Sequence, residues 1–303
     1  MWIGLLPNLQ KESNQKHHFI TGKSLEEVGK KKFNLAILDM SSGEPNQGMR
    51  CIKDIVGRFE DQINYKVFDV RQKSELPEIQ DFDIYISSGG PGSPLDGDGD
   101  WDLKYFDFID HLWIWNQNHN HKKYILFICH SFQMACRHFG LGQLTQRKST
   151  SFGVMAVYKT ADGQHDQLLG NLENPFWAVD SRDYQVVQPD LKKFKLLGAK
   201  IIALEKIRDH VEYERAIMAI RFSDEMVGTQ FHPEVDPISF LNHLKKQEVK
   251  DKVIVTKGKV RFRAMIEHLV DDDKILKTNE TLIPDFLENS IRRVKESQQL
   301  SVI

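Results

Sequence analysis

Residues 124–140, Tyr-Ile-Leu-Phe-Ile-Cys-His-Ser-Phe-Gln-Met-Ala-Cys-Arg-His-Phe-Gly, decide the fold of this chain. The apolar run from Tyr124 to Ile128 has the length and composition of a fully buried strand. Cys129 follows at once, and the spacing then becomes helical until Gly140. A cysteine at such a turn projects its sulfur above the sheet, and the N-terminus of the new helix stabilises a thiolate. Cys129 is therefore a candidate nucleophile, although free cysteines more often only fill space in a core.

The sequence on both sides of this stretch alternates between strand and helix patterns. Apolar runs predict strands at 33–40, 65–70 and 83–86, and helical spacing predicts helices at 49–60 and 103–116. After Gly140 come shorter β-like pieces, at 154–158, 177–179, 186–187, 201–204, 216–221 and 226–235. This order predicts an α/β fold with a mostly parallel central sheet, helices on both faces and a smaller antiparallel part.

Three parts are expected along the chain. Residues 1–32 are polar and Lys-rich and form an N-terminal extension, with a possible short helix around 24–32, whereas 33–236 form the α/β domain. Residues 237–303 are expected to be a helical C-terminal extension, with helices at 238–249, 261–269 and 284–297. We interpret this extension as a cap packed on the domain, and the alternative is a docking surface for a partner protein.

The composition narrows the classes of function. Lys and Arg (41) nearly balance Asp and Glu (43), so no electrostatic footprint for nucleic acid or an anionic membrane is expected. The three cysteines are an odd number at wide spacing, which suggests reduced thiols in a cytoplasmic protein. No apolar run approaches the roughly 20 residues that span a bilayer. The first nine residues lack the basic region and cleavage site of a signal peptide.

A glycine-rich turn, Ser-Ser-Gly-Gly-Pro-Gly-Ser-Pro at 87–94, follows the predicted strand at 83–86. Glycines in this position let the backbone approach a ligand and aim N–H groups at an anion. The turn lacks the spacing of a phosphate loop, so an ordinary tight turn is the simpler interpretation. In an open parallel sheet, however, ligands bind beyond the carboxyl ends of the strands, where both this turn and Cys129 lie.

His232 and Glu234 belong to the last predicted strand, Met-Val-Gly-Thr-Gln-Phe-His-Pro-Glu-Val at 226–235. Residues two apart in an extended chain project to the same side, so we expect Glu234 to orient His232. His232 is then placed to take a proton from a thiol. A lone His-Pro-Glu is more often a surface turn, but its position at the end of an apolar strand favours the catalytic interpretation.

No metal or cofactor is expected. Residues 96–102 (Asp-Gly-Asp-Gly-Asp-Trp-Asp) look like a calcium loop, but Trp101 and Asp107 stand where an EF-hand requires glycine and glutamate. We interpret the segment as an acidic cap of the helix that begins near Leu103, and as a rim of the active site.

Three motifs, in this order, resemble those of the class I (triad) glutamine amidotransferase family. SSGGPGSP (87–94) is similar to the family's SGGPxS or NGPGxP turn, FICHSFQ (127–133) to its GxCxGxQ elbow, and GTQFHPE (228–234) to its GxQFHPE strand. The resemblance covers roughly residues 33–236 and suggests a stand-alone GMP-synthase-glutaminase-like domain with a flavodoxin-like sheet.

The resemblance implies a role for each matching residue. The implied triad consists of Cys129 as nucleophile, His232 as general base and acid, and Glu234 as the residue that orients His232. The backbone N–H groups of Gly90 and His130 match the family's oxyanion hole. The positions that match substrate contacts are Gly92, Gln133 and, more loosely, Ser181 and Tyr184.

The implied activity is hydrolysis of the side-chain amide of glutamine through a Cys129 thioester. Because no synthetase region fits in the remaining chain, ammonia would pass to an unidentified acceptor or to a separate synthetase protein. The alternatives are a γ-glutamyl amide or peptide hydrolase of the same fold, and a non-catalytic regulatory or binding protein. Phe127 and Ser131 stand where the family usually has glycines, so bulk at 127 must point away from the elbow or the site must be reshaped.

Overall fold

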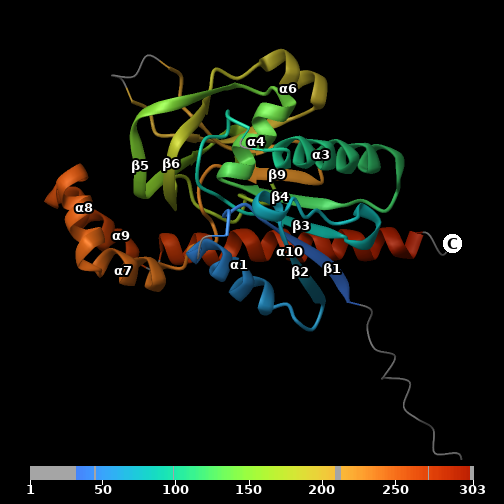
Figure 1. Ribbon diagram of the computed structural model, residues 1–303, viewed down its shortest axis with the longest axis horizontal. Coiled ribbons are helices and arrows are strands. Elements are labelled where there is room, and N and C mark those ends of the chain that lie inside the picture. The colour runs from blue at the N-terminus through green and yellow to red at the C-terminus, as the bar shows by residue number, and fades with distance from the viewer. Residues whose placement is uncertain (1–31, 44–45, 98, 209–212, 272, 301–303) are drawn as a thin grey trace, which may run out of the picture. The chain divides into compact units, whose positions relative to one another are not determined.

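The computed structural model describes residues 32–43, 46–97, 99–208, 213–271 and 273–300, and the structural statements below concern these residues. Apart from Lys32, the expected N-terminal extension, with its possible helix at 24–32, lies outside them. A single nine-stranded sheet organises the fold, with strand order β2-β1-β3-β4-β9-β8-β7-β5-β6 (Figure 1). The strands are β1 (Phe33–Asp39), β2 (Ile63–Asp69), β3 (Ile84–Ser87), β4 (Tyr124–Ile128), β5 (Gln143–Lys159), β6 (Phe176–Val187), β7 (Lys200–Glu205), β8 (Ile217–Arg221) and β9 (Met226–Thr229).

The helices differ greatly in length. The four short ones are α2 (Val70–Lys73), the 3₁₀ turn η1 (Ile79–Asp81), α5 (Ala161–Gln164) and α6 (Leu191–Leu197). The longer ones are α1 (Gln47–Gly57), α3 (Trp101–Asn118), α4 (His130–Phe139), α7 (Pro237–Lys245), α8 (Gln247–Lys257), α9 (Lys259–Leu269) and α10 (Ile275–Leu300). No described helix has the length and apolar character needed to cross a membrane.

The sheet is parallel at one end and antiparallel at the other. Strands β2, β1, β3, β4 and β9 run parallel, while β9, β8, β7, β5 and β6 are joined by antiparallel pairs. The predicted fold class is therefore confirmed. The short β-like pieces at 154–158, 177–179 and 186–187 are parts of two long strands, β5 and β6, which pair as a hairpin with an irregularity between Gln146 and Ser151.

Helices cover both faces of the sheet, and strand β4 shows how the faces are divided. Leu126 and Ile128 belong to the core cluster that includes α1 and α10. Ile125 and Phe127 belong to the cluster on the other face, with α3 and α4. Because successive side chains of a strand alternate between faces, a continuous apolar run produces both layers of core.

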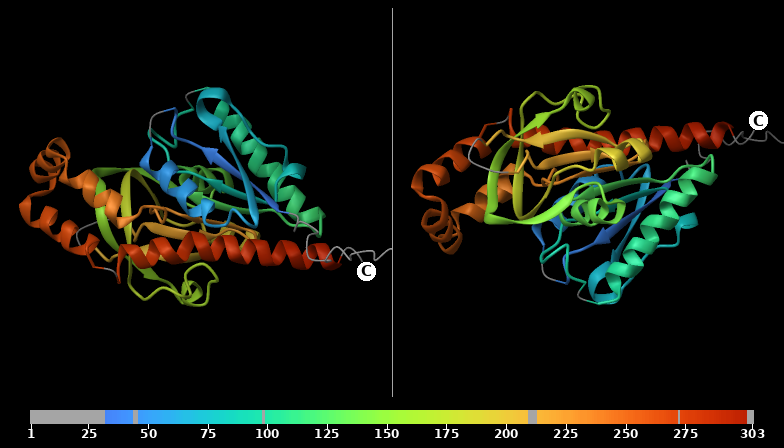
Figure 2. Two further views of the ribbon diagram at one scale, coloured as in Figure 1. Left: turned by 90° about the horizontal axis from the view of Figure 1, so that it is seen from below. Right: turned by 90° about the horizontal axis from the view of Figure 1, so that it is seen from above.

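The C-terminal helices are integrated with the sheet. Helix α10 runs along it (Figures 1 and 2), and its apolar residues, among them Leu282, Ile283 and Leu287, lie in the same core cluster as α1. The helix begins before the predicted start at Pro284, which lies inside it. Helices α7 to α9 form a separate apolar cluster with β5 and β6, in which Met265 contacts the position of Gly153.

Leu287→Ala is expected to lower the free energy of unfolding by about 2–5 kcal/mol, because the side chain is 0% exposed and its removal leaves a cavity. Urea denaturation measures this change. Leu196→Ala in α6 is the matched control, since that side chain is 83% exposed and its loss should change stability by less than about 0.5 kcal/mol. Equal effects of the two substitutions would mean that α10 does not contribute to the core.

Candidate active site

Cys129 has a strained backbone at the junction between β4 and α4. Its φ of 51° and ψ of −98° form a conformation that costs a non-glycine residue about 1–3 kcal/mol. Its N–H donates to the carbonyl of Thr229 at 2.7 Å, and its carbonyl accepts from the N–H of Gln133 at 3.0 Å. The ends of β9 and α4 thus hold the elbow, and the thiol lies at the start of a helix.

The two residues that differ from the family pattern leave the elbow intact. Phe127 is buried on the face that carries α3 and α4, where its ring meets Phe222 edge-on at 5.7 Å. The side chain of Ser131 accepts from the N–H of Ile128 at 2.9 Å and donates to the carbonyl of Ser87 at 2.7 Å. Bulk at 127 therefore points away from Cys129, and the hydroxyl at 131 ties the elbow to β3.

His232 and Glu234 meet through a turn. The predicted strand at 226–235 ends at Thr229, and residues 233 and 234 form a turn, so the expectation of an extended chain is wrong. His232 Nδ1 nevertheless lies 2.7 Å from Glu234 Oε1. The N–H of His232 donates to the carbonyl of Val179 at 2.8 Å, and Asn279 Nδ2 of α10 donates to the carbonyl of Glu234 at 2.8 Å. Strand β6 and helix α10 thus brace the turn from two sides.

The carboxylate of Glu234 is buried beside the N-terminus of α1. A Cβ added to Gly48 would lie 2.8 Å from Glu234 Oε1, so only glycine at this position lets the helix end come so close. The other oxygen, Oε2, is buried and has no hydrogen-bond partner among the described residues. The positive end of the helix dipole stabilises a carboxylate in such a place.

The glycine turn after β3 lies directly against the histidine. A Cβ on Gly89 would lie 2.8 Å from His232 Cε1 and 3.4 Å from Cys129 Cβ, so glycine at this position leaves room for both side chains. A Cβ on Gly90 would lie 2.1 Å from the carbonyl oxygen of Met40, which excludes any side chain there. Glycine at both positions is thus required by close contacts within the protein, and the approach of a ligand stays a prediction.

The other residues matched to the oxyanion hole and the substrate border the same turn. Gly92 is exposed with φ 88°, and Arg71 donates to the carbonyl of the preceding Pro91. His130 begins α4, and its ring lies 6.4 Å from that of Trp101. Because Arg71 also stacks over Trp101 at 5.0 Å, the turn and the start of α3 are held together beside α4.

Gln230 is a residue of the site that the sequence reasoning did not single out. Its Nε2 lies 3.8 Å from Cys129 Sγ, and its Oε1 accepts from Gln133 Nε2 at 3.0 Å. Gln133 also donates to the carbonyl of Tyr184 at 3.2 Å, and the carbonyl of Ser181 lies 3.7 Å from Cys129 Sγ. Ser181 and Tyr184 therefore reach the site through their main chains. The position of Gln230 inside the motif Gly-Thr-Gln-Phe-His-Pro-Glu was a signal by which the sequence could have identified it.

Arg182 is a second residue that the sequence reasoning missed. Its guanidinium is buried and donates through Nε to both carboxylate oxygens of Asp180, at 3.1 and 3.0 Å. Burial lowers the pKa of Arg182, but Asp180 and Glu205, together with Cys129, outweigh it and raise the pKa overall. A permanent positive charge thus lies near the cysteine, and only the tertiary structure reveals it.

The neighbours of His232 raise the pKa of its imidazole. Burial lowers the pKa of His232, but the charge of Cys129 and then that of Glu234 outweigh it, so the pKa lies well above its usual value. Glu234 also hydrogen-bonds the ring, since its Oε1 lies 2.7 Å from Nδ1. Cys129 and Glu234 therefore both favour the protonated form of the His232 ring.

Comparisons with known proteins found a matching family model and solved structures with a similar fold. A family model described as "Glutamine amidotransferase class-I" matches residues 52–251. A glutamine amidotransferase from Thermotoga maritima has a similar fold, with a TM-score of 0.61 and 16% identity over 86% of this chain and 99% of that one. A protein from Thermoplasma acidophilum, described as part of a putative GMP synthase, superposes with a TM-score of 0.52 and 16% identity over 90% and 99% of the two chains.

A third solved structure, the glutaminase domain of a Trypanosoma brucei CTPS with bound acivicin, has a TM-score of 0.50 and 13% identity. It covers 67% of this chain, and the match spans 86% of that chain. A comparison with curated protein sequences found no match. At these identities the solved structures support the fold alone.

Cys129→Ala is expected to lower the pKa of His232, because Cys129 is the strongest of the neighbours that raise it. The variant should therefore lose the imidazolium proton at a lower pH than the wild-type protein. An NMR titration of the histidine ring protons, assigned with His232→Gln, measures this shift. Cys136→Ala removes a thiol elsewhere in the core and should leave the titration unchanged; a shift of equal size in that control would refute the coupling.

Proposed function

The chain belongs to the class I glutamine amidotransferase family, and we propose on this premise that it hydrolyses the side-chain amide of glutamine through a thioester on Cys129. The observation that carries the proposal is the arrangement of Cys129, His232 and Glu234, in which His232 Nδ1 lies 2.7 Å from Glu234 Oε1 and the His232 ring and Cys129 both lie against Gly89. A nucleophile, a base and a group that orients the base are the parts that covalent catalysis by a thiol requires.

The proposed reaction has two steps. The Cys129 thiolate attacks the amide carbon of glutamine, and the new C–S bond turns the carbonyl oxygen into an oxyanion. His232 then gives its proton to the nitrogen, the C–N bond breaks and ammonia leaves, with a γ-glutamyl thioester on Cys129. Water, deprotonated by His232, attacks the thioester, and glutamate and the thiolate are released. The overall change is glutamine plus water to glutamate plus ammonia.

The oxyanion formed in the first step has to be stabilised by hydrogen-bond donors. We propose the N–H groups of Gly90 and His130 as these donors, because one lies in the turn beside Cys129 and the other begins the helix after it. Removal of one such donor typically lowers the rate about 10²–10³-fold. Gly92, Gln133, Ser181 and Tyr184 are proposed to border the glutamine, with Gln133 acting through Gln230.

The ammonia is proposed to pass to a separate synthetase protein. One solved structure with this fold is described as a component of a putative GMP synthase, and its name thus places it within a larger enzyme. The domain is proposed to comprise residues 33–236, with the helices from 237 onward as its cap. Turnover of γ-glutamyl amides without turnover of free glutamine would favour a γ-glutamyl hydrolase instead.

6-Diazo-5-oxo-norleucine, an electrophile shaped like glutamine, is expected to label Cys129 alone, with protection by excess glutamine. The other thiols should stay unlabelled, because burial raises the pKa of Cys51 to about 11 and that of Cys136 well above its usual value. Peptide mass mapping identifies the labelled residue, and Cys129→Ala is the control. Absence of labelling, or equal labelling of Cys51, would count against a glutamine site and favour a non-catalytic role.

Gly89→Ala is expected to lower kcat about 100-fold, because the new methyl group would lie 2.8 Å from His232 Cε1 and displace the ring from Cys129. Glutaminase assays measure the change. Gly57→Ala is the matched control, since a Cβ there meets nothing within 4 Å, and it should retain full activity. Full activity of Gly89→Ala would show that the position of this ring does not govern catalysis.

A further inference from the structure

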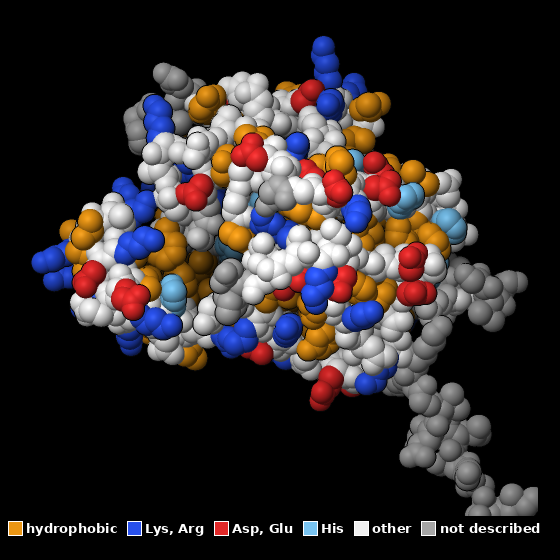
Figure 3. Space-filling model, in the orientation of Figure 1, with side chains coloured by type: hydrophobic (Ala, Val, Ile, Leu, Met, Phe, Trp, Pro, Cys, Tyr) orange, Lys and Arg blue, Asp and Glu red, His pale blue; other side chains and the backbone are white. Residues whose placement is uncertain are grey.

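A cavity lies between β5, the residues that follow β7, and helices α8 and α9. Its volume is about 510 Å³, within the range of about 300–1,000 Å³ that is typical of small-molecule sites. None of the residues that line it is Cys129, His232 or Glu234. In Figure 3, Lys and Arg side chains gather around a hollow beside the helices α8 and α9.

Most of the charged side chains that line this cavity are cationic. Among the described residues, its lining includes a single carboxylate, Glu205, and five cationic side chains: Arg147, Lys206, Arg208, Lys257 and Arg261. Glu205 is already shared, because Arg208 lies 2.6 Å from Oε2 and Arg147 lies 3.5 Å from Oε1. The buried Arg182 adds a third cation, 3.6 Å from the same Oε1. The carboxylate cannot neutralise all of them.

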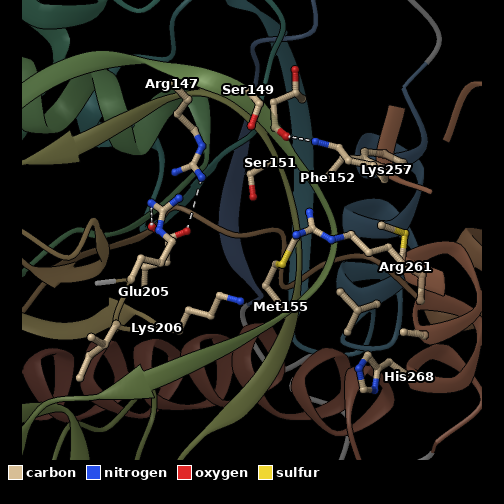
Figure 4. A pocket seen from close by; sticks show the side chains of 16 residues that line it. Arg147, Ser149, Ser151, Phe152, Met155, Glu205, Lys206, Lys257, Arg261 and His268 are labelled. Carbon is tan, nitrogen blue, oxygen red and sulfur yellow. Dashed lines mark hydrogen bonds and ion pairs between the residues drawn. The ribbon is translucent and has the colours of Figure 1, made fainter. Parts of the chain in front are cut away.

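Some N–H donors of this cavity have no partner among the described residues. The Arg147 side chain is only 8% exposed; its Nη1 donates to Gln185 Oε1 at 2.7 Å, but its Nε is buried without a hydrogen bond. Lys206 and Arg261 are exposed, and no hydrogen bond or ion pair joins their side chains to the part of the chain that the structure describes. Figure 4 shows Lys206 and Arg261 reaching from opposite sides toward the same space, with Arg147 above it. Burial and the neighbouring cations Arg182 and Arg208 lower the pKa of Arg147, which an anion would reverse.

The wall beside these donors is apolar. Phe152, Val154 and Met155 of β5 and Met265 of α9 line the cavity together with the cations. A ligand that fits both parts carries a compact, highly charged anion at one end and an apolar or aromatic group at the other. Guanidinium groups favour phosphate because their planar donors match its oxygens in pairs.

We propose that this cavity binds a small phosphorylated molecule, whose phosphate oxygens accept hydrogen bonds from Arg147, Lys206 and Arg261 and whose apolar part lies against Phe152 and Met155. The site adjoins the proposed active site through the sheet. Ser151 and Phe152 pair with Arg182 and Ser181 of β6, and Ser151 Oγ donates to Asp180 at 2.7 Å. The proposal stands on the cavity alone and does not require glutamine hydrolysis.

The test is calorimetric titration of the full chain with inorganic pyrophosphate at two salt concentrations. The wild-type protein is expected to bind one pyrophosphate, and Arg261→Gln and Lys206→Gln should each weaken binding about tenfold or more, since each removes a charge-assisted hydrogen bond. Arg263→Gln is the matched control: Arg263 is exposed like Arg261 and lies on the same helix, but it does not line the cavity, so its loss should change Kd less than about twofold.

Two results would overturn the proposal. One is no binding of pyrophosphate by the wild-type protein at low salt, and the other is equal weakening by Arg263→Gln, which would mean attraction to a basic surface without a site. Thermal unfolding of each variant verifies that it is folded. Labelling of Cys129 by 6-diazo-5-oxo-norleucine serves as an independent readout, because Arg261→Gln should leave it unchanged and failure of one proposal is then distinct from failure of the other.

Discussion

The strained backbone of Cys129 is the constraint on which the surrounding structure depends. A residue with φ 51° and ψ −98° persists only where its neighbours over-determine it. Thr229 at the end of β9 and Ser131 in α4 supply hydrogen bonds on either side of the elbow. Close packing extends to the glycine turn: His232 and Cys129 leave little room for a side chain at position 89, and the carbonyl oxygen of Met40 leaves none at position 90. The strained elbow at Cys129 and the glycines at 89 and 90 thus belong to one closely packed region.

The parts of the fold that the sequence predicted well are those governed by local patterns. The run 124–128 is a strand, and Gly140 ends the following helix in the left-handed conformation. Predictions from the sequence pattern were wrong where tertiary contacts determine the local structure. Pro284 is tolerated inside α10, because the apolar residues on both sides of it lie in the core. The turn after Thr229 was predicted to be strand because an apolar run does not reveal where pairing stops.

The residues of the candidate site likewise fall into those that the sequence predicted and those that it did not. Cys129, His232 and Glu234 were predicted because their motifs are contiguous in sequence, and the structure brings them together. Gln230 and Arg182 were not, because their importance arises from contacts with residues far along the chain, 101 residues in the case of Gln230 and Cys129. Arg182 also joins two regions. Its partners Asp180 and Glu205 extend from the neighbourhood of Cys129 to the basic cavity, so buried charge is continuous between the two.

Helix α10 has a consequence for the order in which the molecule can be completed during synthesis. Asn279 holds the main chain of Glu234 although it follows it by 45 residues, and the apolar side of the same helix closes the core beneath α1. A nascent chain that has emerged only as far as Glu234 therefore contains Cys129, His232 and Glu234 but lacks the hydrogen bond from Asn279. Until α10 has been synthesised, β6 alone can brace the turn at 232–234, through the carbonyl of Val179. The turn at 232–234 therefore reaches its final, doubly braced geometry only after α10 has left the ribosome.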